Sequence, residues 1–167
     1  IAGSNVIAGR VDFGATAKSL DVAAYSADGR LISALQPTLQ LQGIVGSAGG
    51  IVKTGNGALQ FNAPAGYSGP TVVNAGSIRT GATLGGSRNS ALTVASGAFL
   101  NLNGLTTAWG SLAGDGVIMN SSTSAATLVV GFDGSSTIFS GQLTRNNDSA
   151  VNTVALQKVG TGAVSYT

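Results

Sequence analysis

A short phrase of lysine and glycine occurs twice in the chain and constrains its fold more than any other feature. The first copy, KTGNGAL, covers residues 53–59, and the second, KVGTGAV, covers residues 158–164. Glycines at this spacing are typical of tight turns, because glycine adopts positive φ angles without steric cost. A chain that contains the same turn twice at such a distance is predicted to be built from repeated units.

The composition favours strands and turns over helices. Of the 167 residues, 26 are glycine, 8 % are charged, and none is glutamate, histidine or cysteine. Exposed helices normally rely on glutamate, lysine, arginine and glutamine, which are scarce here. Short runs of valine, isoleucine, leucine and threonine between glycine, asparagine and serine are typical of strands and turns. The apolar content of 43 % is sufficient for a buried core.

Strand-like runs bounded by turn residues recur along most of the chain. They span residues 39–42, 51–53, 59–62, 71–74, 77–80, 91–95, 99–103, 116–119, 127–130, 137–139, 142–144, 154–158 and 164–166. Residues 15–28 fit either a short helix or a strand pair that turns at Asp28-Gly29. Many short strands suit a sandwich, an antiparallel barrel or a solenoid, and the repeat favours the solenoid. We therefore expect one all-β domain over residues 1–167, with no significant helix.

Residues 49–81 resemble the autotransporter-associated β-strand repeat of bacterial type V secreted passengers. That pattern runs Gly-Gly-apolar, Lys-Thr-Gly-x-Gly, an alternating strand, Tyr-x-Gly, and then Thr-x-Val-x-x-Gly-x-apolar. The matching residues are Gly49, Gly50, Ile51, Lys53, Thr54, Gly55, Gly57, Leu59, Phe61, Tyr67, Gly69, Thr71, Val73, Gly76 and Ile78. Two departures are a phenylalanine at position 61 in place of leucine and the sequence NAPAGY, residues 62–67, in place of the more typical Gly-x-Asn-x-Tyr. Residues 39–167 are repeat-like, whereas residues 1–38 stay unassigned, with a capping or assembly role left open.

The resemblance implies a right-handed parallel β-helix of about seven rungs, with coils of ~20–25 residues. The two lysine-glycine phrases would then mark the same corner of the β-helix, several rungs apart. Both lysines are interpreted as strand-end residues with solvated tips. Structural corner and repeat positions are expected at Gly49, Gly50, Lys53, Gly55, Gly57, Tyr67, Gly69, Gly76, Lys158, Gly160 and Gly162.

Two substitutions express these expectations. Valine at Gly55 or Gly57 should destabilise the fold by about 1–3 kcal/mol if either glycine has a positive φ angle. Glutamine at Lys53 should change stability little, because a solvated lysine contributes little. Residues 156–167 match only the start of a repeat, so we expect either a longer rod or a neighbouring chain to continue it.

The chain offers few groups for catalysis. Without histidine and cysteine, the usual nucleophile–base pairs cannot form. Three of the six aspartates precede glycine and are interpreted as turn residues: Asp28, Asp115 and Asp133. We predict no enzymatic activity, catalytic residue, cofactor or metal site. Four aromatic residues are candidates for stacking on a carbohydrate, with core packing as the alternative: Tyr25, Tyr67, Trp109 and Tyr166.

The expected function follows from the resemblance, which implies an extracellular structural module at the bacterial cell surface, a stalk or adhesin scaffold. A self-assembling filament subunit, joined head to tail with residues 1–13 as a donor strand, is the alternative. A polysaccharide-binding or polysaccharide-degrading β-helix is the third hypothesis. The partners in view are a host or neighbouring-cell surface, matrix, a glycan, or other copies meeting at open β-helix ends. The scattered positive charges indicate no nucleic-acid partner, and no membrane insertion of this segment is expected.

Overall fold

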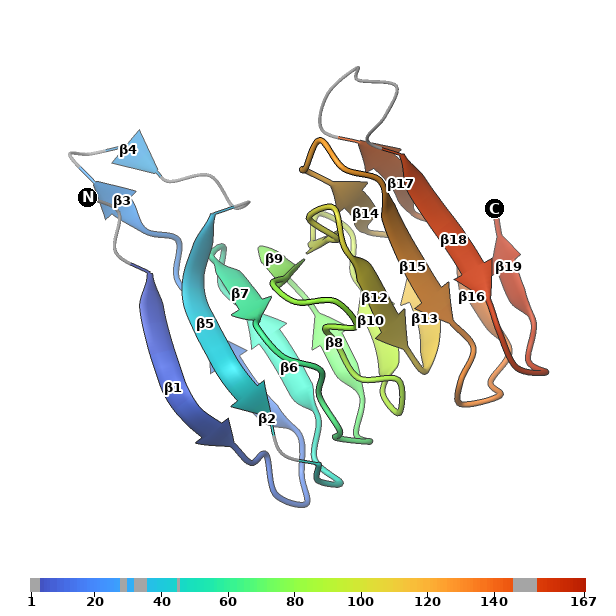
Figure 1. Cartoon of the computed structure of the whole chain (residues 1–167), viewed down its shortest axis with the longest axis horizontal. Helices are drawn as coiled ribbons and strands as arrows, with labels where there is room; N and C mark the ends of the chain where they lie inside the picture. Colours follow the sequence, from blue (N-terminus) through green and yellow to red (C-terminus); the bar gives the residue numbers. More distant parts are fainter. Residues whose placement is uncertain (1–3, 28–29, 32–35, 45, 146–152) are drawn as a thin grey trace.

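The chain forms a parallel β-helix in this computed structural model (Figure 1). The structure describes residues 4–27, 30–31, 36–44, 46–145 and 153–167. None of these residues lies in a helix, which confirms the all-β prediction. A search of the same residues finds no helix with the length and apolarity that a membrane crossing requires.

Three all-parallel sheets make up the faces of the β-helix. The first sheet consists of β1 (Asn5–Val11), β5 (Pro37–Ile44), β7 (Ala58–Phe61), β9 (Ser77–Thr80), β11 (Phe99–Asn101), β14 (Val117–Asn120) and β17 (Gln142–Arg145). The second consists of β2 (Lys18–Asp21), β6 (Ile51–Thr54), β8 (Thr71–Val73), β10 (Ala91–Val94), β13 (Ser111–Gly114), β16 (Thr137–Phe139) and β19 (Val164–Tyr166). The third consists of β12 (Thr106–Trp109), β15 (Ala126–Val130) and β18 (Val154–Lys158). Seven strands in each of two sheets agree with the predicted number of rungs.

Each full coil passes through the first sheet, the third face and the second sheet before returning to the first. Figure 1 shows these coils side by side, from β1 and β2 at one end to β17, β18 and β19 at the other. In the N-terminal half the third face consists of loops rich in glycine, proline and serine. Single parallel bridges join Pro64 to Gly86 between two of these loops, and Gly85 to Thr107 of β12. From β12 onwards the third face is a regular sheet.

The interior is a stack of apolar columns. On the first sheet, the register aligns inward-facing residues of successive strands in one column: Leu39, Leu59, Ile78, Leu100, Ile118 and Leu143. Successive side chains of a strand point to opposite faces, so one residue per strand joins each column. Because every coil buries its inner face against the coils on either side, the core is continuous along the rod.

The N-terminal segment belongs to the same β-helix. Strand β1 pairs in parallel with β5, and β2 pairs with β6, so residues 5–21 form the first coil. The ambiguous segment, residues 15–28, contains β2 and also β3 (Ser26–Ala27), which pairs antiparallel with β4 (Arg30–Leu31). Of the two structures that the sequence allowed here, a short helix or a strand pair, the chain forms the strand pair. Its predicted turn, Asp28-Gly29, lies outside the described residues.

Candidate functional site

Lys53 lies at the end of β6 and points into the β-helix, so the prediction of a solvated tip is wrong. Its side chain is fully buried, and the register places it beside Val73 in an inward-facing column of the second sheet. The Nζ atom donates hydrogen bonds to the carbonyl oxygens of Thr54 and Gly55, each at 2.7 Å, and of Ala75 at 3.0 Å. All three protons of the ammonium group therefore meet an acceptor.

The interior position of Lys53 changes its acid–base behaviour. Burial lowers the pKa of Lys53 to about 8, while the negative charge of Asp21 acts in the opposite direction. Lysine is rarely fully buried, which is why the residue type suggested an exposed position. The alternation of β6 was the better signal, because Ile51 and Lys53 lie two residues apart and are both buried.

The second phrase forms the same local turn. The Nζ atom of Lys158 donates to the carbonyl oxygens of Val159 at 3.0 Å and Gly160 at 2.6 Å. Gly160 has a φ angle of 67°, and its counterpart Gly55 has 71°. Lys158 is exposed, and within the described part of the chain its hydrogen bonds stay inside its own turn. The repeated phrase thus specifies a turn in which a lysine binds the two carbonyls that follow it.

The two copies occupy different corners of the β-helix, which corrects the prediction of one recurring corner. The first copy joins β6 to β7 and leads from the second sheet to the first. The second copy joins β18 to β19 and leads from the third sheet to the second. A local turn can serve either corner, because both connect strands of neighbouring sheets and the turn is set by its own residues.

The other predicted glycines lie at several corners of the β-helix, and positive φ angles do not account for all of them. Gly57 and Gly162 do not have positive φ angles, contrary to the corner interpretation. Instead, a Cβ atom on Gly57 would lie 2.2 Å from the carbonyl oxygen of Ala23, and one on Gly162 would lie 2.1 Å from that of Ser135. Close backbone packing between coils therefore requires these glycines. A Cβ atom would also meet backbone oxygen or nitrogen within 2.6 Å at Gly49, Gly50, Gly69 and Gly76.

The four candidate aromatic residues do not form one carbohydrate site. Trp109 and Tyr67 are buried in the core. Tyr67 packs edge-on against Phe13 with ring centroids 5.4 Å apart, and its hydroxyl group lies 2.7 Å from Thr71 Oγ1. Burial raises the pKa of Tyr67 above its ordinary value. These two rings therefore pack the interior and are closed to a ligand.

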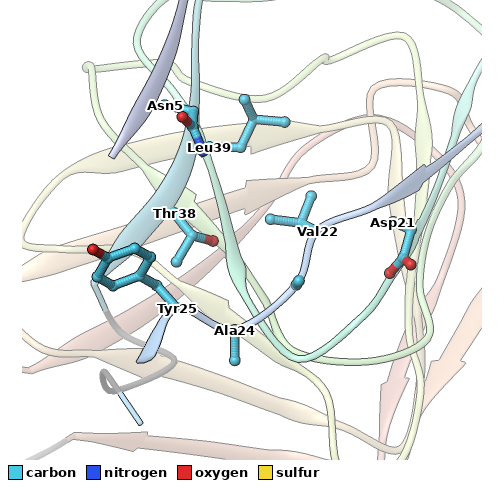
Figure 2. A pocket seen from close by; sticks show the side chains of 8 residues that line it. Asn5, Asp21, Val22, Ala24, Tyr25, Thr38 and Leu39 are labelled. Carbon is cyan, nitrogen blue, oxygen red and sulfur yellow. The ribbon is translucent and has the colours of Figure 1, made fainter. Parts of the chain in front are cut away.

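The two exposed tyrosines lie on different coils. Tyr166, in β19, stacks on Phe139 with a centroid separation of 6.1 Å. Tyr25 belongs to a pocket of about 240 Å³ at the N-terminal end, lined by Asn5, Asp21, Val22, Ala23, Ala24, Tyr25, Thr38 and Leu39. Figure 2 shows Asp21 and Tyr25 on opposite sides of this pocket, with Val22, on the segment that follows β2, between them. The polar groups do not converge, so the pocket has no arrangement that indicates catalysis.

A row of polar side chains that was not predicted from the sequence lies on the outer face of the first sheet. Gln40, Gln60 and Arg79 are aligned by the register of β5, β7 and β9. Gln40 donates to Ser4 Oγ at 2.6 Å, and Gln60 donates to Gln40 Oε1 at 3.2 Å. Arg79 donates to Gln60 Oε1 and, at 2.7 Å, to Asn103 Oδ1.

We call this row, together with Asn62, the amide ladder. Its signal was present in the alternation of each strand, since Gln40, Gln60 and Arg79 each stand between two residues of the inner face. Only the alignment of neighbouring coils, which depends on the length of every loop, brings them together.

Among the residues that the structure describes, no three aspartates lie together as metal ligands. No family model, curated protein or solved structure matches the chain. The autotransporter-associated repeat is therefore a resemblance of residues 49–81, and the fold is the main support for a functional proposal.

Proposed function

We propose that the chain is a non-enzymatic, extracellular structural module, a β-helical stalk or adhesin scaffold segment of an autotransporter-like bacterial surface protein. The observation that carries this proposal is the way in which each coil holds the next. Parallel ladders connect successive coils, and Lys53 adds a side-chain bond to the coil that follows it. A rod whose stability comes from contacts between neighbouring coils can fold coil by coil as the chain emerges from a membrane.

The composition supports a structural rather than a catalytic role. Few residues are charged, the usual nucleophile–base pairs are excluded, and much of the polar surface consists of serine, threonine, asparagine and glutamine. Such a surface is compatible with long exposure to solvent. The residues that resemble the passenger repeat, 49–81, include closely packed corners, where a Cβ atom on Gly50 would lie 2.0 Å from the carbonyl oxygen of Pro70.

Surface display in a Gram-negative host tests the proposal. The chain is placed between a secretion signal and an autotransporter translocator domain, with an epitope tag at its N-terminal end. We expect the tag to reach the cell surface and the exported chain to leave a protease-resistant core. The Gly55→Val variant, which should fail to form its corner, is expected to lose the resistant core. Retention of the unaltered chain inside the cell, while another passenger is displayed by the same translocator, would contradict the proposal.

A self-assembling filament subunit is the second candidate, and one observation favours it. Among the described residues, strands β17, β18 and β19 are the last strands of their sheets, and each pairs with a neighbour on one side only. Tyr166 stacks on Phe139 yet remains 56 % exposed, so a further coil placed on β19 would bury apolar surface. Strand β1 is already paired with β5, so it would join a neighbour through its free edge rather than by leaving its own sheet.

Light scattering and electron microscopy on the purified chain test whether it assembles into filaments. End-to-end filaments that disappear when residues 1–13 are deleted would support it. A monomer at high concentration would remove it and leave the stalk proposal unaffected.

A further inference from the structure

Arg79 is the charged member of the amide ladder. It donates to Gln60, which in turn donates to Gln40 and Asn62. Its two terminal nitrogens donate in opposite directions, one to Gln60 Oε1 and the other to Asn103 Oδ1. Its Nε atom is buried and has no hydrogen-bond partner. Two amide oxygens from neighbouring coils therefore hold the plane of the guanidinium group in one orientation.

The amide oxygens of the ladder accept hydrogen bonds from other members of the ladder. The Nε2 atom of Gln60 donates to Gln40 Oε1 at 3.2 Å and to Asn62 Oδ1 at 2.6 Å. The Nδ2 atom of Asn62 donates to Gln40 Oε1 at 2.8 Å. Every amide oxygen in this set thus accepts a bond from within the ladder. Terminal N–H groups of Arg79, and the second amide protons of Gln40 and Asn62, remain to be satisfied from outside.

The positive charge on this face is not neutralised within the described residues. Arg79 donates to two neutral amides, and no carboxylate of the described residues forms an ion pair with it. Burial lowers the pKa of the Arg79 guanidinium from its ordinary value, although arginine remains protonated at neutral pH. A partly desolvated guanidinium that is held by neutral groups gains strongly from a carboxylate or sulfate, which accepts two parallel N–H bonds.

We propose that the outer face of the first sheet around Arg79 binds the carboxylate or sulfate groups of an acidic polysaccharide. The ladder runs over several successive coils, about 4.8 Å apart, so its donors form a line along the rod rather than a closed pocket. A linear polymer that offers an acidic group to Arg79 and hydroxyl groups to the amides of the neighbouring coils fits such a line better than a compact ion does. This inference goes beyond the proposed structural role, because it assigns a ligand class to one face of the rod.

Binding measurements with four probes test the inference. Polygalacturonate supplies carboxylates, heparin supplies sulfates, dextran is uncharged, and inorganic phosphate is a small anion. We expect the chain to bind at least one acidic polymer and not dextran. Preference for one acidic polymer identifies the acidic group that is recognised. Phosphate binding as strong as polymer binding would overturn the polysaccharide assignment.

Two variants locate the site on Arg79, provided that their thermal melting matches that of the unaltered chain. Arg79→Gln removes the charge, and Asn103→Asp places a carboxylate beside Arg79 at nearly constant volume. Each should weaken polymer binding by at least ~10-fold. The control is Arg88→Gln, because Arg88 lies elsewhere, 5.6 Å from the centre of the Phe132 ring. Equal losses for Arg79→Gln and Arg88→Gln would mean that the whole surface attracts the polymer by charge alone and would overturn the inference.

The outcome is separable from the proposed function. A chain that is displayed on the cell surface but binds neither acidic polymer would refute the ligand and keep the structural role. A chain that binds through Arg79 but is not displayed would do the reverse.

Discussion

The ammonium nitrogen of Lys53 lies 3.0 Å from the carbonyl oxygen of Ala75, 22 residues further along the chain. Ala75 belongs to the turn between β8 and β9, whereas Lys53 precedes the turn between β6 and β7. One side chain therefore joins two successive turns at the same edge of the second sheet. The same Nζ atom also binds two carbonyls of its own turn, so Lys53 stabilises the corner and the stacking of coils together.

Replacing Lys53 with methionine should lower the free energy of unfolding by about 2–4 kcal/mol. The carbonyls of Gly55 and Ala75 would lose a buried donor, while the Thr54 carbonyl keeps a bond from the backbone of Val22. Lys158→Met is the matched control and should cost less than about 1 kcal/mol, because water can reach the carbonyls of that exposed turn. Urea unfolding measures both. Equal losses of stability for Lys53→Met and Lys158→Met would contradict the interpretation that the buried Lys53 joins two successive turns.

Stability should rise between pH 8 and about pH 10 and fall at higher pH. The folded chain releases the Lys53 proton near pH 8, but the unfolded chain holds it up to the ordinary pKa of 10.5. The unfolded state therefore binds more protons in this range, and the free energy of unfolding increases with pH. The buried Tyr67 acts in the opposite direction above pH 10, because its raised pKa means that the unfolded tyrosine ionises first.

Urea unfolding at a series of pH values checks this behaviour. The Lys53→Met variant should lose the rise and keep the fall, which assigns each effect to its residue. A parent chain whose stability is flat from pH 8 to pH 10 would contradict the assignment to Lys53.

Alanine substitutions at four glycines should separate backbone strain from crowding. Gly97 has a φ angle of 76° with open space around it, so Gly97→Ala should show strain alone, about 1 kcal/mol. Gly57 has an ordinary φ angle but lies against the Ala23 carbonyl, so Gly57→Ala should show crowding alone. Gly55 has both a positive φ angle and close neighbours, so Gly55→Ala should destabilise the fold the most. Gly9 has neither feature, so Gly9→Ala should leave the stability unchanged.

Thermal or chemical unfolding of the four variants gives this order directly. Because each variant adds the same single methyl group to a glycine, differences in intrinsic residue propensity largely cancel. A Gly57→Ala variant as stable as Gly9→Ala would show that the coils can move apart at that corner without cost.

Trp109 should report the core and not a surface ligand. It is the single tryptophan of the chain, it is 1 % exposed, and it lies 6.3 Å from the ring of Phe61. We expect a short-wavelength emission maximum, weak quenching by acrylamide, and no change on addition of a polysaccharide. Gly86→Ala should increase the quenching, because a Cβ atom there would lie 2.6 Å from the indole ring. Strong quenching of the unaltered chain would place Trp109 at the surface instead.

The fold class and most of the strands could be predicted from local residues of the sequence. Alternating runs such as Leu59-Gln60-Phe61 identify a strand and its inner face from local residues, and the glycine-bounded turns show where each strand ends. Strands β12 and β13 were not predicted. They are separated by one residue, Gly110, so the sequence shows no turn-like stretch that would mark them as two strands. Strand β2 was hidden in a segment whose residues suit both helix and strand.

Tertiary structure decided the environment of each residue. The phrase at Lys53 and the phrase at Lys158 specify one turn, but only the stacking of coils makes the first lysine buried and leaves the second exposed. The amide ladder likewise depends on loop lengths that align Gln40, Gln60 and Arg79 across three coils. Local sequence sets the dihedral angles of a turn and the face of a strand. Burial and hydrogen-bond partners come from residues about twenty positions away, and their register is set only when every intervening loop has folded.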